Sequence, residues 1–296
     1  MDQARRIIHC EEAWSMGYTG KNVGVAILDT GIFPHGDFDN RISAFADFIQ
    51  KRSGVYDDNG HGTHISAIIG GSGRDSGGRY CGVAPDSRII SVKVLDSRGN
   101  GYAADVLAGL RWIRRYREMY GIRIVNISVG SYVRKWMGEN SALVKGVNAA
   151  WDDGLVVVVA AGNNGPKSMT ITTPGISRKV ITVGCSDDDK EINVMGNRMV
   201  DYSGRGPTRS CVLKPDIVAP GSSVVSCSNR PGRYQVKSGT SMSTPLVSGA
   251  LALLLEKYPD MTNRDVKLLL RERAVDMGLP HTRQGWGLLD VERLLR

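Results

Sequence analysis

The sequence predicts an α/β fold, a three-layer, doubly wound, mostly parallel sheet with helices on both faces. Short uninterrupted apolar runs, such as residues 23–28 and 155–161, are typical of parallel strands that are covered on both faces. These runs alternate along the chain with amphipathic segments of helical length, such as residues 103–120. Strands that alternate with helices favour a parallel sheet between two helical layers.

The expected elements follow this alternation along the whole chain. Apolar runs predict strands at residues 23–28, 88–95, 122–129, 155–161, 180–184, 216–221 and 224–226, with a hairpin turn around residues 231–232. Helical patterns predict helices at residues 61–69, 103–120 and 141–152. Four further helices are expected: a short one that ends near residue 17, one that begins near Ser241, one that runs through Arg273, and a short one after residue 287. Thr262 and Asp265 form the capping-box pattern of a helix start. The acidic residues 187–189 are expected to form a solvated loop.

The 296 residues are enough for one large domain with a sizeable core. The sequence has neither an internal repeat nor a convincing linker. We therefore expect residues 1–296 to form a single domain, in which residues 1–11 are a short N-terminal extension.

Composition limits the compartment and the partners of the chain. No apolar run approaches the roughly 20 residues of a membrane span, and the N-terminus lacks the apolar core of a secretory signal. We expect a cytoplasmic protein, or a secreted one if the chain is a processed form. The net charge is +8, but the basic residues fall in helical patterns at 111–117 and 267–273 that are typical of solvated helix faces. We therefore expect neither a nucleic acid nor a membrane as partner, and the oligomeric state is left open.

Five cysteines are scattered along the chain without a C-x-x-C pair. An odd and dispersed set favours reduced thiols in a reducing compartment, although a disulfide is left open.

Residues 238–245 carry the strongest sign of chemistry. Gly239 allows a sharp turn, and Pro245 suits the first turn of the apolar helix that follows. Ser241 is then expected at a helix N-terminus, where backbone N–H groups and the helix dipole favour developing negative charge. This makes Ser241 a candidate nucleophile beside an anion site. The same residues also fit a simple Ser/Thr helix cap followed by core.

Asp29 comes directly after the buried strand at 23–28 and begins an Asp-Thr-Gly sequence. The carboxyl ends of parallel strands are where α/β folds place their sites. The same pattern also marks aspartic proteases, in which two such carboxylates share a proton. No second Asp-Thr/Ser-Gly follows a comparable strand here, and the alternation of strands and helices disagrees with the mostly β fold of that class.

His61 and His64 lie three apart in a segment that is expected to start a helix through two glycines. Two histidines at this spacing can bind a metal, but no Cys, third His or Glu at a familiar spacing completes a ligand set. His61 is instead a candidate base for Ser241, with Asp29 as the acid that orients it.

The order Asp29, His61, Ser241 resembles that of the subtilisin-like serine proteases, the subtilases. The matching segments are 25–31 (VAILDTG), 59–64 (NGHGTH) and 239–245 (GTSMSTP), with support from 82–85 (GVAP), 160–163 (AAGN), 202–208 (YSGRGPT) and 214–221 (KPDIVAPG). They occur in family order and span about residues 12 to 295. The resemblance implies a subtilisin-like fold.

The resemblance also implies a role for each matching residue. Ser241 would attack the scissile carbonyl, His61 would transfer the proton, and Asp29 would hold the imidazole. Asn163 would form the oxyanion hole with the Ser241 backbone N–H. Two edges would hold an extended polypeptide substrate through main-chain hydrogen bonds: Gly99, Asn100 and Gly101 on one side, and Ser128, Val129 and Gly130 on the other.

The expected function is therefore a serine endopeptidase that acts on polypeptides through an acyl-enzyme intermediate at neutral to alkaline pH. The alternatives are a catalytically silent scaffold with the same fold and a metal-dependent hydrolase. An intact set of Asp29, His61, Ser241 and Asn163 argues against a silent scaffold.

Two features depart from the secreted bacterial subtilisins. Nothing before residue 12 is long enough for a folding propeptide. The loop at 70–81 lacks the Asn-containing pattern of their calcium site and resembles the intracellular or AprX-like bacterial members of the family. No cofactor is expected to be needed for the chemistry; a structural calcium ion is left open but not indicated, and no metal ligands are assigned.

Overall fold

Seven parallel strands form the central sheet of the structure, a computed structural model that describes residues 1–130, 138–194 and 197–296. The strands lie in the order β2-β3-β1-β4-β5-β6-β9, and each neighbouring pair is parallel. Their bounds are β1 Gly24–Asp29, β2 Ile42–Asp47, β3 Arg88–Lys93, β4 Ile122–Ile127, β5 Val156–Ala160, β6 Ile181–Cys185 and β9 Ile217–Ala219. Two small antiparallel pairs join β7 (Ile192–Val194) to β8 (Asn197–Met199), and β10 (Val224–Cys227) to β11 (Tyr234–Lys237).

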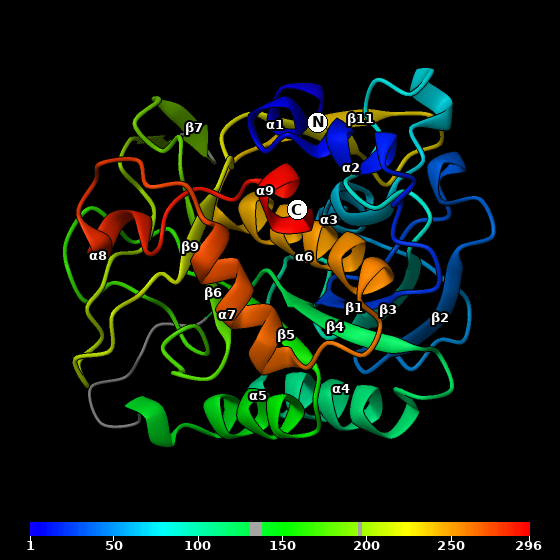
Figure 1. Cartoon of the computed structure of the whole chain (residues 1–296). Helices are drawn as coiled ribbons and strands as arrows, with labels where there is room; N and C mark the ends of the chain where they lie inside the picture. Colours follow the sequence, from blue (N-terminus) through cyan, green and yellow to red (C-terminus); the bar gives the residue numbers. More distant parts are fainter. Residues whose placement is uncertain (131–137, 195–196) are drawn as a thin grey trace.

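Helices cover both faces of the sheet. Figure 1 shows α4 and α5 together along one side, whereas α3 and α6 pack against each other on the opposite side. The helices are α1 Asp2–Ile7, α2 Cys10–Ser15, α3 His61–Gly70, α4 Ala103–Tyr116, α5 Ala142–Asp152, α6 Thr240–Lys257, α7 Asn263–Arg273, α8 His281–Gln284 and α9 Val291–Leu295. This arrangement confirms the predicted three-layer α/β fold. No helix among the described residues combines the length and the apolar character that crossing a membrane requires.

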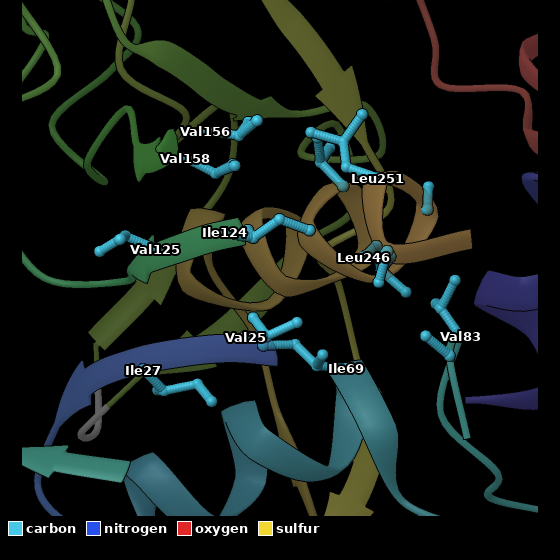
Figure 2. Packing of buried hydrophobic residues seen from close by; sticks show 14 of the residues in the cluster. Val25, Ile27, Ile69, Val83, Ile124, Val125, Val156, Val158, Leu246 and Leu251 are labelled. Atoms are coloured by element: carbon cyan, nitrogen blue, oxygen red, sulfur yellow. The ribbon is translucent and has the colours of Figure 1, made fainter. Parts of the chain in front are cut away.

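The core is built around α6, which is buried along almost its whole length. Leu246 and Leu251 of this helix lie among side chains from the central strands (Figure 2). Ile124 of β4 points toward α6 and Val125 points away, as the alternation of side chains along a strand requires. A helix that is apolar all round is stable only when it is buried in this way, and α6 therefore provides a rigid support for its first turn.

The carboxyl ends of β1, β4 and β5 meet at one edge of the sheet. The register pairs Leu28 of β1 with Ile127 of β4, and Ile127 with Val159 of β5. Asp29 ends β1, and Ser128 follows β4 directly. This edge is where the sequence-predicted site residues come together.

The N-terminal segment differs from the single helix expected there. Two helices, α1 and α2, are separated at His9, whose backbone is in the left-handed region with φ of 50°. Met1, Ile8 and Cys10 are buried in the main core. The buried apolar residues of this N-terminal segment therefore belong to the main core.

Three further expectations were wrong in detail. Residues 187–189 do not form a simple solvated loop, because Asp188 is fully buried and its carboxylate accepts hydrogen bonds from the Ser203 N–H and the Arg283 guanidinium. The helix α4 ends at Tyr116, four residues early. Pro245 lies in the second turn of α6, since that helix already starts at Thr240. The capping box of Thr262 and Asp265 is confirmed.

Candidate active site

Asp29 and His61 form the polar pair at the centre of the site. Asp29 is 1% exposed at the end of β1, and His61 is the first residue of α3. The His61 Nδ1 and Asp29 Oδ1 atoms lie 2.7 Å apart, and the Thr30 N–H donates to the same oxygen at 2.8 Å. At Gly62 a Cβ atom would collide with the Gly31 carbonyl oxygen, so the close approach of α3 to the end of β1 requires glycine there.

A buried carboxylate that sequence reasoning missed anchors this helix start. Asp57 accepts hydrogen bonds from the Thr30 hydroxyl at 2.9 Å, from the Gly60 N–H at 2.8 Å and from the Thr63 N–H at 2.9 Å. Burial alone would raise the pKa of Asp57, but the hydrogen bonds from Gly60 and Thr63 outweigh it and lower that pKa. The ionised Asp57 thus holds the first turn of α3, and with it His61, against the end of β1. The sequence does carry a sign of this anchor, the acidic pair Asp57-Asp58 directly before Asn59-Gly60.

Ser241 lies in the first turn of α6, as expected for a residue at a helix N-terminus. Gly239 precedes the helix with φ of 136°, a backbone conformation that favours glycine. The Ser241 hydroxyl donates to the Ser128 carbonyl oxygen at 2.7 Å. Its oxygen therefore lies at the same sheet edge as Asp29 and His61.

Asn163 is held beside Ser241 by its amide oxygen. The Thr240 N–H and the Thr240 hydroxyl each donate to Asn163 Oδ1 at 3.0 Å. Two donors on the oxygen orient the amide so that its NH₂ group is the side available to a ligand. Gly239 permits this packing, because a Cβ atom there would lie 3.0 Å from Asn163 Nδ2.

One cleft of about 530 Å³ contains His61, Ser241 and Asn163 together. Gly99, Ser128, Val129 and Gly130 also line it. A second cavity of about 260 Å³ is lined by Gly99, Asn100, Gly101, Val129 and Gly130, among others. The structure therefore places all six predicted substrate-edge residues on these two cavities, which share Gly99, Val129 and Gly130.

Lys237 is a second residue that sequence reasoning missed. It ends β11, lines the same cleft and lies four residues before Ser241. Burial lowers the pKa of Lys237, and the negative charges of Asp29 and Asp57 oppose that decrease. The positive charge of Lys237 makes the electrostatic potential of the cleft more positive. The sequence did not predict Lys237 as a site residue, because a single lysine in a strand is not part of any recognisable motif.

His64 does not share the environment of His61. It is fully buried, and its Nε2 atom lies 3.2 Å from the carbonyl oxygens of Val224 and Gln235. Burial lowers the pKa of His64 well below its usual value, so the ring is neutral at physiological pH. His64 therefore has a structural role that binds α3 to the β10–β11 hairpin. All five cysteines are free thiols, as the sequence favoured.

Comparison with known proteins agrees with this geometry. Residues 20–287 match the Subtilase family, Peptidase_S8. The chain is 42% identical to "Serine protease AprX" of Bacillus subtilis (strain 168) over 92% of its own length and 66% of that protein. It is 33% identical to "Subtilisin DY" of Bacillus licheniformis over 97% of its own length and 95% of that protein.

Comparison with solved structures also finds subtilisin-like proteins. The solved structure of "Sphericase" superimposes with a TM-score of 0.77 and 32% identity, and the match covers 92% of each chain. The chain spans 66% of the length of AprX but nearly the whole of subtilisin DY. The family match and these identities confirm the resemblance that the three sequence blocks indicated: the chain belongs to the subtilase family of peptidases.

Proposed function

We propose that this chain is a serine endopeptidase that hydrolyses peptide bonds in polypeptides through an acyl-enzyme intermediate. The observation that carries the proposal is the 2.7 Å contact of His61 Nδ1 with Asp29, in a cleft that His61 shares with Ser241 and Asn163. Relatives at 42% and 33% identity that are named a serine protease and a subtilisin support it.

In the proposed mechanism Asp29, His61 and Ser241 form a proton-transfer chain. Rotation of the Ser241 hydroxyl away from the Ser128 carbonyl directs its proton to His61 Nε2, since Nδ1 donates to Asp29. The Ser241 oxygen attacks the substrate carbonyl, and the imidazolium then protonates the leaving amine. A water molecule, deprotonated by His61, then attacks the acyl-enzyme in the same way, and the carboxylic acid product leaves as Ser241 regains its proton. No metal or cofactor takes part in these steps, and the base must be neutral, which favours neutral to alkaline pH.

Asn163 and the Ser241 N–H are the proposed donors to the oxyanion. The negative charge on the substrate oxygen develops only as the tetrahedral intermediate forms, so a donor fixed in place stabilises the transition state more than the ground state. The two hydrogen bonds from Thr240 fix the Asn163 amide before substrate arrives.

Replacement of Asn163 by alanine is expected to lower kcat by about 10²–10³-fold, the loss measured in subtilisin for the equivalent donor, with little change in KM. Steady-state hydrolysis of a chromogenic peptide checks this. Asn164→Ala is the matched control, since that residue lines the same cleft but is not a proposed donor. Equal losses in both variants would remove Asn163 from the oxyanion hole.

The substrate backbone is proposed to lie between the edge at Gly99, Asn100 and Gly101 and the edge at Ser128, Val129 and Gly130. Extended peptides add to such edges through main-chain hydrogen bonds, and small residues let them approach closely. The position of all six residues on the two cavities supports this placement. The cytoplasmic location and the single domain expected from the sequence stay predictions.

Labelling with a serine-directed fluorophosphonate probe tests the proposal. An active Ser241 displaces fluoride from phosphorus and keeps the probe, because the proton passes to His61 as in acylation. We expect one label per chain in the wild type and none in Ser241→Ala. Failure of a folded wild-type chain to react would favour a silent scaffold of the same fold.

A further inference from the structure

We propose that His35, Asp37, Asp75 and Cys227 form a binding site for one Zn²⁺ ion, separate from the catalytic cleft. These four residues, called here the His35 cluster, come from three parts of the chain: the segment after β1, which includes the short helix η1 (Gly36–Phe38), the short helix η2 (Arg74–Ser76), and strand β10. The side chains of His35 and Asp37 are fully buried, Cys227 is fully buried, and the side chain of Asp75 is 30% exposed.

The spacing of three of the ligand atoms fits a tetrahedral ion. Zinc bonds to sulfur, nitrogen and oxygen are about 2.0–2.3 Å long, so neighbouring ligand atoms of a tetrahedral site lie about 3.3–3.8 Å apart. Cys227 Sγ lies 3.3 Å from Asp37 Oδ2 and 3.5 Å from His35 Nδ1. The ligand atoms of His35, Asp37 and Cys227 all lie within 4.8 Å of one another. Asp75 Oδ2 lies 3.5 Å from the same His35 nitrogen, and we assign Asp75 as the fourth ligand, which would close on the ion from the exposed side.

The histidine is already in the tautomer that such a site needs. His35 Nε2 lies 3.2 Å from the Arg233 carbonyl oxygen and therefore carries the proton. His35 Nδ1 accepts the Asp37 N–H at 3.2 Å, so the lone pair is on the nitrogen that faces the cluster. Metal-bound histidines are usually oriented in this way, by a hydrogen bond from the second ring nitrogen to a carbonyl or carboxylate. Zinc binding would therefore replace the long hydrogen bond between the Asp37 N–H and His35 Nδ1 with a coordinate bond from Nδ1 to the ion.

The charge of the cluster also calls for a cation. Among the residues that the structure describes, neither Asp37 nor Asp75 forms an ion pair with a lysine or arginine side chain. The donors to the Asp37 carboxylate in the described part of the chain are uncharged: the Tyr234 hydroxyl at 2.9 Å, the Cys227 thiol and the Asp75 N–H at 2.9 Å. A fully buried carboxylate without a counter-charge is costly, and a divalent ion supplies that charge.

The ligand types select the metal. A thiolate and an imidazole are ligands that zinc prefers, whereas calcium takes six to eight oxygen ligands. Binding would displace the Cys227 proton to solvent and leave two carboxylates, one thiolate and a neutral imidazole around Zn²⁺. The partly exposed Asp75 gives the ion a route of entry.

The site would connect segments that are far apart in the sequence. His35 and Cys227 are 192 residues apart, and Cys227 lies in the β10–β11 hairpin that leads into the first turn of α6. None of the four residues lines the catalytic cleft. We therefore infer a structural role, in which the ion fixes the hairpin beside Ser241 without taking part in the chemistry.

Metal binding to the full chain tests this inference. Ser241→Ala serves as the parent protein, because it cannot digest itself. Dialysis against Zn²⁺ followed by elemental analysis is expected to give one zinc per chain. Exchange for Co²⁺ is expected to produce a thiolate-to-cobalt charge-transfer band, which Cys227→Ser loses. The matched control is Cys185→Ser, which removes another buried thiol and is expected to keep both the metal and the band.

Two further variants keep the test decisive if Cys227→Ser does not fold. Asp75→Asn changes a partly exposed ligand and is expected to weaken Zn²⁺ affinity by at least about 10–100-fold, the loss typical of removing even a residue that only hydrogen-bonds to a ligand. His61→Gln is expected to retain one zinc, which excludes binding in the catalytic cleft. Absence of stoichiometric zinc in the parent, a cobalt band that survives Cys227→Ser, or zinc lost only in His61→Gln would each overturn the site. These results are independent of fluorophosphonate labelling.

Discussion

The Ser241→Ala enzyme is expected to hydrolyse peptides with a kcat about 10⁶-fold below that of the wild type, close to the loss seen in subtilisin when its nucleophile is removed. Alanine has no oxygen that could form the acyl-enzyme, so there is no hydroxyl proton for His61 to accept and no imidazolium for Asp29 to stabilise. A residual acceleration of about 10³–10⁴-fold over the uncatalysed reaction should remain, because the Asn163 amide and the substrate edges are unchanged. Single-turnover and steady-state assays with a fluorogenic peptide measure both values.

Ser243→Ala is the matched control for this prediction. Ser243 lies two residues further along α6 and is fully buried, and its hydroxyl has no hydrogen-bond partner within the described ranges of the chain. Its removal should leave kcat within a few-fold of the wild type. More than about 1% of wild-type activity in pure Ser241→Ala protein would contradict a serine nucleophile, since the expected loss is several orders of magnitude larger.

Replacement of Asp29 by asparagine is expected to lower kcat by about 10⁴-fold while KM changes only a few-fold. Asp29 Oδ1 lies 2.7 Å from His61 Nδ1, where it selects the tautomer with the proton on Nδ1 and stabilises the imidazolium. An amide has no negative charge to offer, and its NH₂ group favours the opposite tautomer. Among the described residues, the second oxygen, Asp29 Oδ2, is buried and has no hydrogen-bond partner, so Oδ1, which also accepts the Thr30 N–H, is the oxygen that orients His61.

The kcat–KM comparison separates this effect from misfolding. Asp189→Asn removes a carboxylate at an exposed position and should leave both constants unchanged. A matching urea midpoint for Asp29→Asn and the wild type would show that the fold is intact. A loss of less than 10-fold in kcat would mean that Asp29 does not orient the catalytic histidine.

Buried parallel strands were predictable from the sequence because their environment imposes a simple pattern. The apolar runs predicted at 23–28 and 155–161 correspond to β1 and β5, which are buried along their full length. Strand β2 (Ile42–Asp47) was not predicted, since it lies at the edge of the sheet and is only half-buried, so it needs no apolar run. The break between α1 and α2 depends on the backbone of His9, which composition does not reveal.

The residues of the candidate site also fall into those that the sequence predicts and those that it does not. Asp29, His61, Ser241 and Asn163 each lie in a motif whose glycines and flanking apolar residues mark a fixed backbone shape. Lys237 lines the cleft only because the fold brings β11 there, and its sequence surroundings are ordinary. Asp57 had a sequence signal in the acidic pair before Asn59, but its hydrogen bond to Thr30 exists only in the folded chain. The His35 cluster is the extreme case, because its members are up to 192 residues apart and have no recognisable spacing.

The bonds between Thr240 and Asn163 have a consequence for anyone who redesigns this enzyme. The residue that holds the amide is the direct neighbour of Ser241, so a displacement of α6 carries the attacking oxygen and the amide together. Their mutual geometry is thus insulated from movements of the surrounding loops. Remodelling of the Gly99–Gly101 or Ser128–Gly130 borders can therefore alter which polypeptides are accepted while the reactive centre keeps its shape.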